Sequence, residues 1–105
     1  MLRKLQTERE KWAEYNFGGT SSEEMFLGIV EELGELSHSR LKHMQGIRTN
    51  EDHVEMSKDA VGDIVIFLAG YCEASGFDME DAVTKAWGEV KQRDWKKFPK
   101  NGKNE

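Results

Sequence analysis

The chain has 105 residues and a formal net charge of −5, with 33% charged and 37% hydrophobic residues. This length fits one domain with a modest core, and the composition is typical of a helical protein rather than a disordered one. With this negative charge the chain lacks the excess of basic residues that nucleic-acid-binding proteins show. No run of about 18 apolar residues and no signal-peptide core are present, so we expect a cytoplasmic protein that does not enter membranes.

The apolar pattern predicts an all-α fold, because no segment alternates apolar and polar residues for long enough to indicate a strand. The first predicted helix covers residues 2 to about 15 and ends before Gly18, since glycine tolerates the left-handed cap. Ser21 and Glu24 fit a capping box, so a second helix begins there and runs to about residue 44, with Gly46 as its end.

A third helix is expected after Thr49 or Asn50, either of which is a suitable cap. Residues 60–72 within it are apolar nearly all round, which predicts the most buried helix of the fold. The lone Cys72 in this run excludes an intramolecular disulfide and suggests a buried, inert thiol. A fourth helix is expected to begin after the cap Asp78 and to end near Pro99. Residues 1–99 then form a single domain, and residues 100–105 form a polar, flexible tail.

Acidic residues interrupt the apolar pattern of the two central helices. Glu32 and Glu35 are three residues apart on one flank of the second helix, and Glu31 points further towards solvent. Gly28 lies one turn before Glu32, which suggests a clear surface beside the acids. Because two antiparallel helices would converge these donors with a second acidic pair, they suggest a carboxylate site for a hard divalent ion. An ordinary solvated acidic face is the alternative.

The second acidic pair is Asp59 and Asp63, four residues apart on the third helix and therefore on one face. The expected ion is Mg²⁺, with Mn²⁺ as the alternative, and a solvent-open ion of this kind is the usual partner of substrate phosphates. We expect Glu32, Glu35 and Asp63 as metal ligands, Asp59 as a fourth, and Glu31 to orient a water molecule.

The order and spacing of these acids resemble the MazG-like family of all-α nucleoside triphosphate pyrophosphohydrolases, over residues 12–99. The family pattern Glu-Glu-x-x-Glu matches Glu31-Glu32-Leu-Gly-Glu35, and the last acid of its second part, Glu-x-x-Asp, matches Asp63. Ala60 stands where that second part has glutamate, and the neighbouring Asp59 is the substitute. The resemblance implies Mg²⁺-dependent cleavage of a nucleoside triphosphate between its α and β phosphates, with Glu31, Glu32, Glu35 and Asp63 as catalytic residues.

The end of the fourth predicted helix offers cations and an aromatic for a triphosphate and a base. Family members often carry Asn-x-x-basic-aromatic-Pro there, which resembles Asp94 to Pro99 with aspartate in place of asparagine. We expect Lys91, Asp94 and Lys97 to bind substrate, although cations in a last helical turn also suit the helix dipole. Phe17 is a candidate for stacking on the base, with burial in the core as the alternative.

Two alternatives remain open. Glu35-x-x-His38 is one copy of the element that di-iron bundles need twice, and no second copy exists; His43 and His53 lie near helix ends and are expected to be exposed. The departure at Ala60 leaves a non-catalytic homologue, a helical oligomer that binds nucleotide or protein, as the competing function. Since two helical hairpins bury little on their own, we expect a homodimer or homotetramer with the site close to or across the interface.

Overall fold

The computed structural model describes residues 1–104, and within them every regular element is a helix. The last residue of the predicted tail, Glu105, lies outside the described residues. The helices are α1 (Leu2–Phe17), α2 (Ser22–Gln45), α3 (His53–Ser75) and α4 (Met79–Val90). The all-α prediction is therefore confirmed.

The predicted helix ends are mostly confirmed, because local capping chemistry determines them. The Ser21 hydroxyl accepts the backbone N–H of Glu24 at 3.3 Å, and the Asp78 carboxylate accepts that of Asp81 at 2.9 Å. Each side chain satisfies a backbone donor that has no partner inside the helix. The first three helices end at left-handed glycines, which are Gly18, Gly46 and Gly76.

The start of α3 differs from the prediction. Its cap is Asp52, whose carboxylate accepts the Glu55 N–H at 3.1 Å, and not Thr49 or Asn50. The connection between α2 and α3 is accordingly longer than expected. Arg48 turns this connection with a φ of 52°, which is rare for a residue other than glycine.

The end of α4 was also predicted wrongly, since the helix stops at Val90 rather than near Pro99. The Asp94 carboxylate accepts the Lys97 N–H at 2.9 Å, while the Asp94 N–H donates to the Gly102 carbonyl at 2.9 Å. An aspartate that bonds nearby backbone in this way competes with helix formation. Residues 91–103 therefore form a series of turns.

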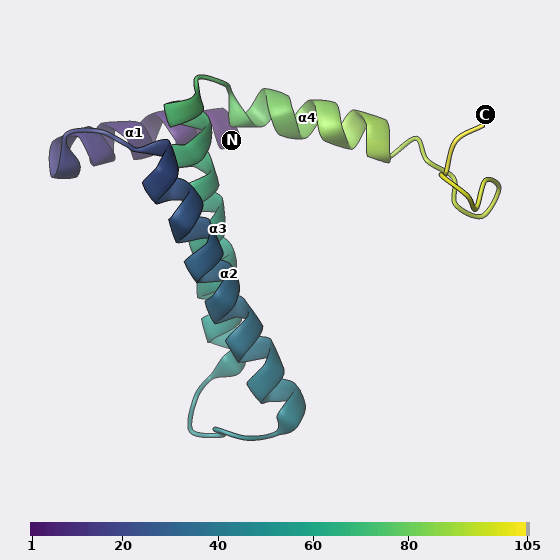
Figure 1. Cartoon of the computed structure of the whole chain (residues 1–105), viewed down its shortest axis with the longest axis horizontal. Coiled ribbons are helices and arrows are strands. Elements are labelled where there is room, and N and C mark those ends of the chain that lie inside the picture. Colours follow the sequence, from purple (N-terminus) through teal and green to yellow (C-terminus); the bar gives the residue numbers. More distant parts are fainter. Residues whose placement is uncertain (105) are drawn as a thin grey trace.

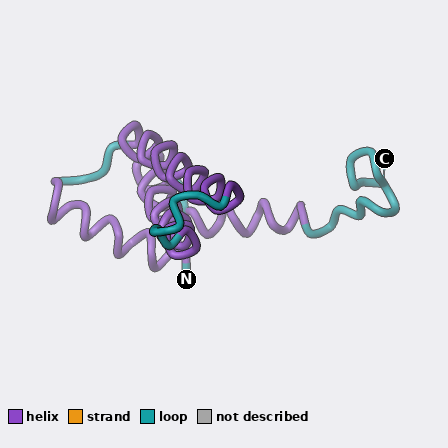
Figure 2. The backbone as a smooth tube through the Cα atoms, turned by 90° about the horizontal axis from the view of Figure 1, so that it is seen from below, coloured by secondary structure: helices purple, strands orange, loops and turns teal. Residues whose placement is uncertain are grey.

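The helices form an open, branched arrangement. α2 and α3 lie side by side as an antiparallel hairpin, and α1 and α4 leave one end of it in opposite directions (Figure 1). Figure 2 shows α1, and α4 with the C-terminal turns, extending on either side of the hairpin. The radius of gyration is 17.5 Å, whereas a compact chain of this length has about 13 Å. The single chain is therefore far from compact.

The buried core lies where α1, the end of α3 and the start of α4 meet, a region that we call the junction. Ala69, Cys72 and Met79 are buried there, and Leu2, Leu5 and Val65 pack against them. The predicted burial of Cys72 is confirmed, and this burial raises the pKa of its thiol.

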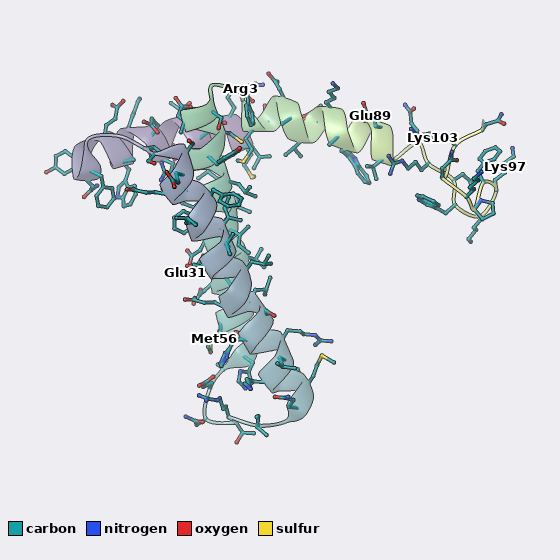
Figure 3. The ribbon with its side chains drawn as sticks, viewed as in Figure 1. Arg3, Glu31, Met56, Glu89, Lys97 and Lys103 are labelled. Atoms are coloured by element: carbon teal, nitrogen blue, oxygen red, sulfur yellow. The ribbon has the colours of Figure 1, made fainter. Side chains whose placement is uncertain are left out.

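Polar side chains also connect the helices at the junction. The Gln6 amide oxygen accepts the Met79 N–H at 2.8 Å, while its nitrogen donates to the Glu73 carboxylate and the Phe77 carbonyl, both at 3.0 Å. Arg3, labelled in Figure 3, lies beside three acids of the α4 start at 2.8–2.9 Å, which are Asp78, Glu80 and Asp81. The junction thus satisfies most of its own polar groups.

Large apolar side chains remain exposed along the hairpin and α4. As predicted, α3 has more buried residues than any other helix within residues 1–104. Within residues 60–72, however, the buried residues are only the small Ala60, Ala69, Gly70 and Cys72. Exposed apolar side chains on α2 and α3 include Phe26, Val30, Leu33, Val61 and Ile66. No single helix within residues 1–104 is long and apolar enough to cross a membrane; α3 and α4, bent by 108° at their break, pass that test together by length and composition only.

Candidate metal centre

Three glutamates of α2 converge on one side of the hairpin. One carboxylate oxygen each from Glu31, Glu32 and Glu35 lies within 4.8 Å of the other two. Their spacing along the helix brings them together, since residues three or four apart are neighbours on a helix surface. Glu31 is exposed, as expected, and projects from the side of the hairpin in Figure 3. Exposed acidic groups of this kind are common without an ion.

Glu32 distinguishes this cluster from an ordinary solvated face. Its side chain is buried, with only 9% of its surface exposed, and within residues 1–104 its Oε2 atom has no hydrogen-bond partner. Burial raises the pKa of Glu32, and the neighbouring carboxylates of Glu35, Asp63 and Glu31 raise it further. The ionised form is thus destabilised by both desolvation and repulsion, which are the conditions that a bound cation relieves.

The aspartates of α3 contribute unequally. Asp63 is exposed and lies outside the group of carboxylates that meet within 4.8 Å, but its charge raises the pKa of Glu32 from the facing helix. Asp59 is exposed and lies outside the group of carboxylates that meet within 4.8 Å. Ala60, at the position where the family pattern has glutamate, is 2% exposed. The structure therefore brings together Glu31, Glu32 and Glu35, with Asp63 nearby, and leaves Asp59 apart.

The surface beside the acids is not clear, contrary to the prediction from Gly28. A Cβ atom added at Gly28 would overlap the ring of Phe67 from α3. Glycine is needed here because the aromatic ring of one hairpin helix packs directly on the backbone of the other. Phe67 thus lies one helical turn from Glu32 along α2, next to the acidic cluster.

The predicted substrate-binding residues lie far from the acids within one chain. In Figure 3 Lys97 lies beyond the end of α4, whereas Glu31 lies along the hairpin. Lys91 caps the end of α4, and Asp94 is engaged in the turns that follow. The Lys97 ammonium lies 5.7 Å from the centre of the Phe98 ring. One chain alone does not bring these residues to the acidic cluster.

Phe17 is 74% exposed at the end of α1, so core burial does not explain it. Its ring stands edge-on to that of Trp12, with 5.5 Å between ring centroids. Edge-to-face is one of the arrangements that aromatic pairs prefer. An aromatic surface is therefore available at this end of the molecule, also outside the acidic cluster.

One polar cluster was missed from the sequence. His53 was expected to be exposed but is 8% exposed, and it lies with Glu51 and His38 at the tip of the hairpin. The contacts depend on the turn at Arg48, which folds Glu51 back towards the end of α2. Hydrophobic periodicity does not predict a turn of this kind. The two histidines and the glutamate on either side of the short connection could have been used to predict the cluster.

No protein-family model, curated protein or solved structure matches this chain.

Proposed function

We propose that this protein is a Mg²⁺-dependent nucleoside triphosphate pyrophosphohydrolase of the MazG-like family that acts as a homo-oligomer. The observation that carries the proposal is the buried carboxylate of Glu32, which meets Glu31 and Glu35 and whose pKa is also raised by the charge of Asp63. A purely structural helix gains nothing from a buried carboxylate whose neighbours are other acids. A carboxylate-only donor set also favours a hard ion such as Mg²⁺ or Mn²⁺.

In this proposal Glu32, Glu35 and Asp63 hold the ion and Glu31 orients the attacking water. Bound Mg²⁺ supplies charge neutralisation on the phosphate oxygens and lowers the pKa of a coordinated water. Water adds across the anhydride bond between the α and β phosphates, which gives a nucleoside monophosphate and pyrophosphate. Asp59, exposed one turn before Asp63, is the fourth ligand in this proposal.

The exposed apolar surface and the extended shape support assembly as a homodimer or homotetramer. Contiguous exposed apolar patches of large size mark interaction sites in soluble proteins. A second copy that covers α2 and α3 also offers a way for its own α4 end, with Lys91, Asp94 and Lys97, to approach the acidic cluster of the first. The substrate would then be bound between chains.

Pyrophosphate release from a panel of deoxynucleoside and ribonucleoside triphosphates with Mg²⁺ tests the catalytic proposal. We expect Glu35→Gln to lower kcat/KM by on the order of 100-fold, because it removes a charge that positions the ion. Glu23→Gln, an exposed glutamate in the first turn of the same helix, is the matched control and should keep full activity. Absence of activity on every triphosphate, or equal rates for both variants, would reject the proposal.

Ala60 favours a second candidate, a nucleotide-binding homologue without turnover. The MazG-like pattern has a glutamate at this position of α3, whereas this chain has a buried alanine, which offers no carboxylate. Isothermal titration with a non-hydrolysable triphosphate distinguishes the two functions. Binding that needs Glu32 and Mg²⁺ but is accompanied by no pyrophosphate release would favour this second candidate.

A further inference from the structure

The tip of the hairpin, where α2 ends and α3 begins, contains a second group of potential ligands. It lies at the end of the hairpin opposite α1 and α4, beyond the Met56 label in Figure 3. His38 of α2 has its Nε2 atom 3.5 Å from Glu51 Oε2, and His53 of α3 has its Nδ1 atom 3.8 Å from the same oxygen. One carboxylate oxygen is therefore the shared neighbour of two imidazole nitrogens.

The hydrogen bond on the other side of the His53 ring fixes its tautomer. His53 Nε2 lies 3.1 Å from the carbonyl oxygen of Ile47, and a carbonyl only accepts, so Nε2 carries the hydrogen. In the neutral ring Nδ1 then presents a lone pair to the Glu51 carboxylate. Within residues 1–104 neither His53 Nδ1 nor Glu51 Oε2 has a hydrogen-bond partner, and both atoms are buried.

Two buried acceptors that face each other repel unless a proton or a metal ion lies between them. Donation of the second ring N–H to a backbone carbonyl is the arrangement that metal-ligating histidines usually show. Ligands of a tetrahedral Zn²⁺ ion, bound at roughly 2.0–2.1 Å, are about 3.4 Å apart. The two nitrogen-to-oxygen separations need only a small contraction to reach that value. The two imidazole nitrogens lie further apart, since within residues 1–104 only Glu31, Glu32 and Glu35 all meet within 4.8 Å, so binding needs the partly exposed His38 side chain to move towards His53.

We propose that His38, Glu51 and His53 bind a divalent transition-metal ion of the Zn²⁺ class, which links α2 to α3 at the tip of the hairpin. Imidazole donors select such ions over Mg²⁺, in contrast to the carboxylates of the acidic cluster. The other oxygen of Glu51 lies 3.7 Å from the Arg48 guanidinium, which leaves Oε2 for the ion. His38 is partly exposed, so an ion has access from solvent.

Titration of the full chain with Co²⁺ tests this site, because the visible absorption of Co²⁺ reports its coordination geometry. Excess Mg²⁺ is present throughout to occupy the acidic cluster. We expect one Co²⁺ per chain, displaced by Zn²⁺, with binding weakened by at least tenfold in His38→Ala and in Glu51→Gln. These two positions are partly exposed, so the variants test the ligands without removing the buried His53 ring.

His43→Ala is the matched control, since His43 is exposed and stands edge-on to His53 with 6.2 Å between ring centroids. It should change Co²⁺ affinity by less than about threefold. Zn²⁺ should also raise the thermal unfolding midpoint of the wild type and of His43→Ala but not of His38→Ala.

Three outcomes would overturn the proposal. The first is Co²⁺ binding that His38→Ala and Glu51→Gln leave unchanged. The second is Co²⁺ binding that Glu35→Gln abolishes, which would assign the ion to the acidic cluster. The third is stabilisation by acid alone, without any effect of Zn²⁺, which would place a proton rather than a metal ion between Glu51 and His53. None of these experiments measures pyrophosphohydrolase activity. Rejection of this metal site would therefore leave the proposed function untouched.

Discussion

The junction and the middle of the α2–α3 hairpin are built in opposite ways. At the junction Ala69, Cys72 and Met79 are buried, and Gln6 uses both ends of its amide to join α1 to the α3–α4 turn. In the middle of the hairpin Leu33 is exposed while the carboxylate of Glu32 is buried. The junction buries its core within one chain, whereas the middle of the hairpin leaves apolar side chains exposed and buries a carboxylate whose Oε2 atom has no hydrogen-bond partner within residues 1–104.

Among the substitutions considered, a charge placed on the exposed apolar face of the hairpin should have the largest effect on assembly and activity. We expect Leu33→Lys, which puts an ammonium on a side chain that is 56% exposed in one chain, to dissociate the proposed oligomer. Light scattering should then give the 12.1 kDa monomer, and pyrophosphate release should fall by on the order of 100-fold if substrate binds between chains.

Tyr15→Lys provides the comparison for this substitution, because Tyr15 is an exposed aromatic at the end of α1 and away from the hairpin. It should leave the mass of the assembly unchanged. A wild-type protein that is already monomeric at micromolar concentration would contradict the proposed assembly.

Truncation of a junction side chain should lower stability without touching the acidic cluster. We expect Met79→Ala to reduce the free energy of unfolding by about 2–3 kcal/mol, through lost burial and the cavity that remains. Urea denaturation at one protein concentration measures the change, because assembly makes stability depend on concentration. Met44→Ala, at an exposed methionine near the end of α2, should cost less than about 1 kcal/mol, and an equal loss in both variants would argue against a core at the junction.

The smallest expected effect is a gain in stability from neutralising Glu32. The folded state raises the pKa of Glu32 above the ordinary 4.5, so its contribution to stability is present below that value and is lost as the pH rises through the folded-state pKa. Glu32→Gln stays neutral, and without metal it should unfold at a higher temperature than the wild type at pH 8 but at a similar temperature near pH 4.

Mg²⁺ should stabilise the wild type at pH 8 and have little effect on Glu32→Gln. Glu31→Gln, an exposed neighbour, should give a smaller change of the unfolding temperature. If Glu32→Gln is instead the less stable protein at pH 8, Glu32 has a structural partner rather than an electrostatic cost.

The sequence predicted features that depend on neighbours along the chain. Ser21 and Asp78 cap their helices as expected, and Gly46 ends α2, because each acts on backbone within a few residues. The convergence of Glu31, Glu32 and Glu35 follows from helical spacing for the same reason. The family resemblance and the function remain predictions from the pattern of acids.

Features that depend on distant contacts were not predictable in this way. The ring of Phe67 over Gly28 and the burial of His53 result from how α3 folds back on α2. The end of α4 at Val90 was missed because Asp94 donates its N–H to the Gly102 carbonyl and accepts the Lys97 N–H on its carboxylate, and both contacts compete with helix propagation. Helix propensity does not include such contacts. The apolar residues of α3 are exposed because the helices of one chain form an open arrangement. Sequence periodicity predicts the helices but not how they are arranged.

The contacts of Gln6 have a consequence for the order of folding. Gln6 meets Glu73, Phe77 and Met79, which are 67, 71 and 73 residues away along the chain. The α2–α3 hairpin, by contrast, joins neighbouring helices through a short connection, and local contacts of this kind form fastest. We expect the hairpin to form early during synthesis on the ribosome. We expect α1 to complete its docking only after residue 79 has left the exit tunnel, because the contacts of Gln6 with Phe77 and Met79 need the start of α4.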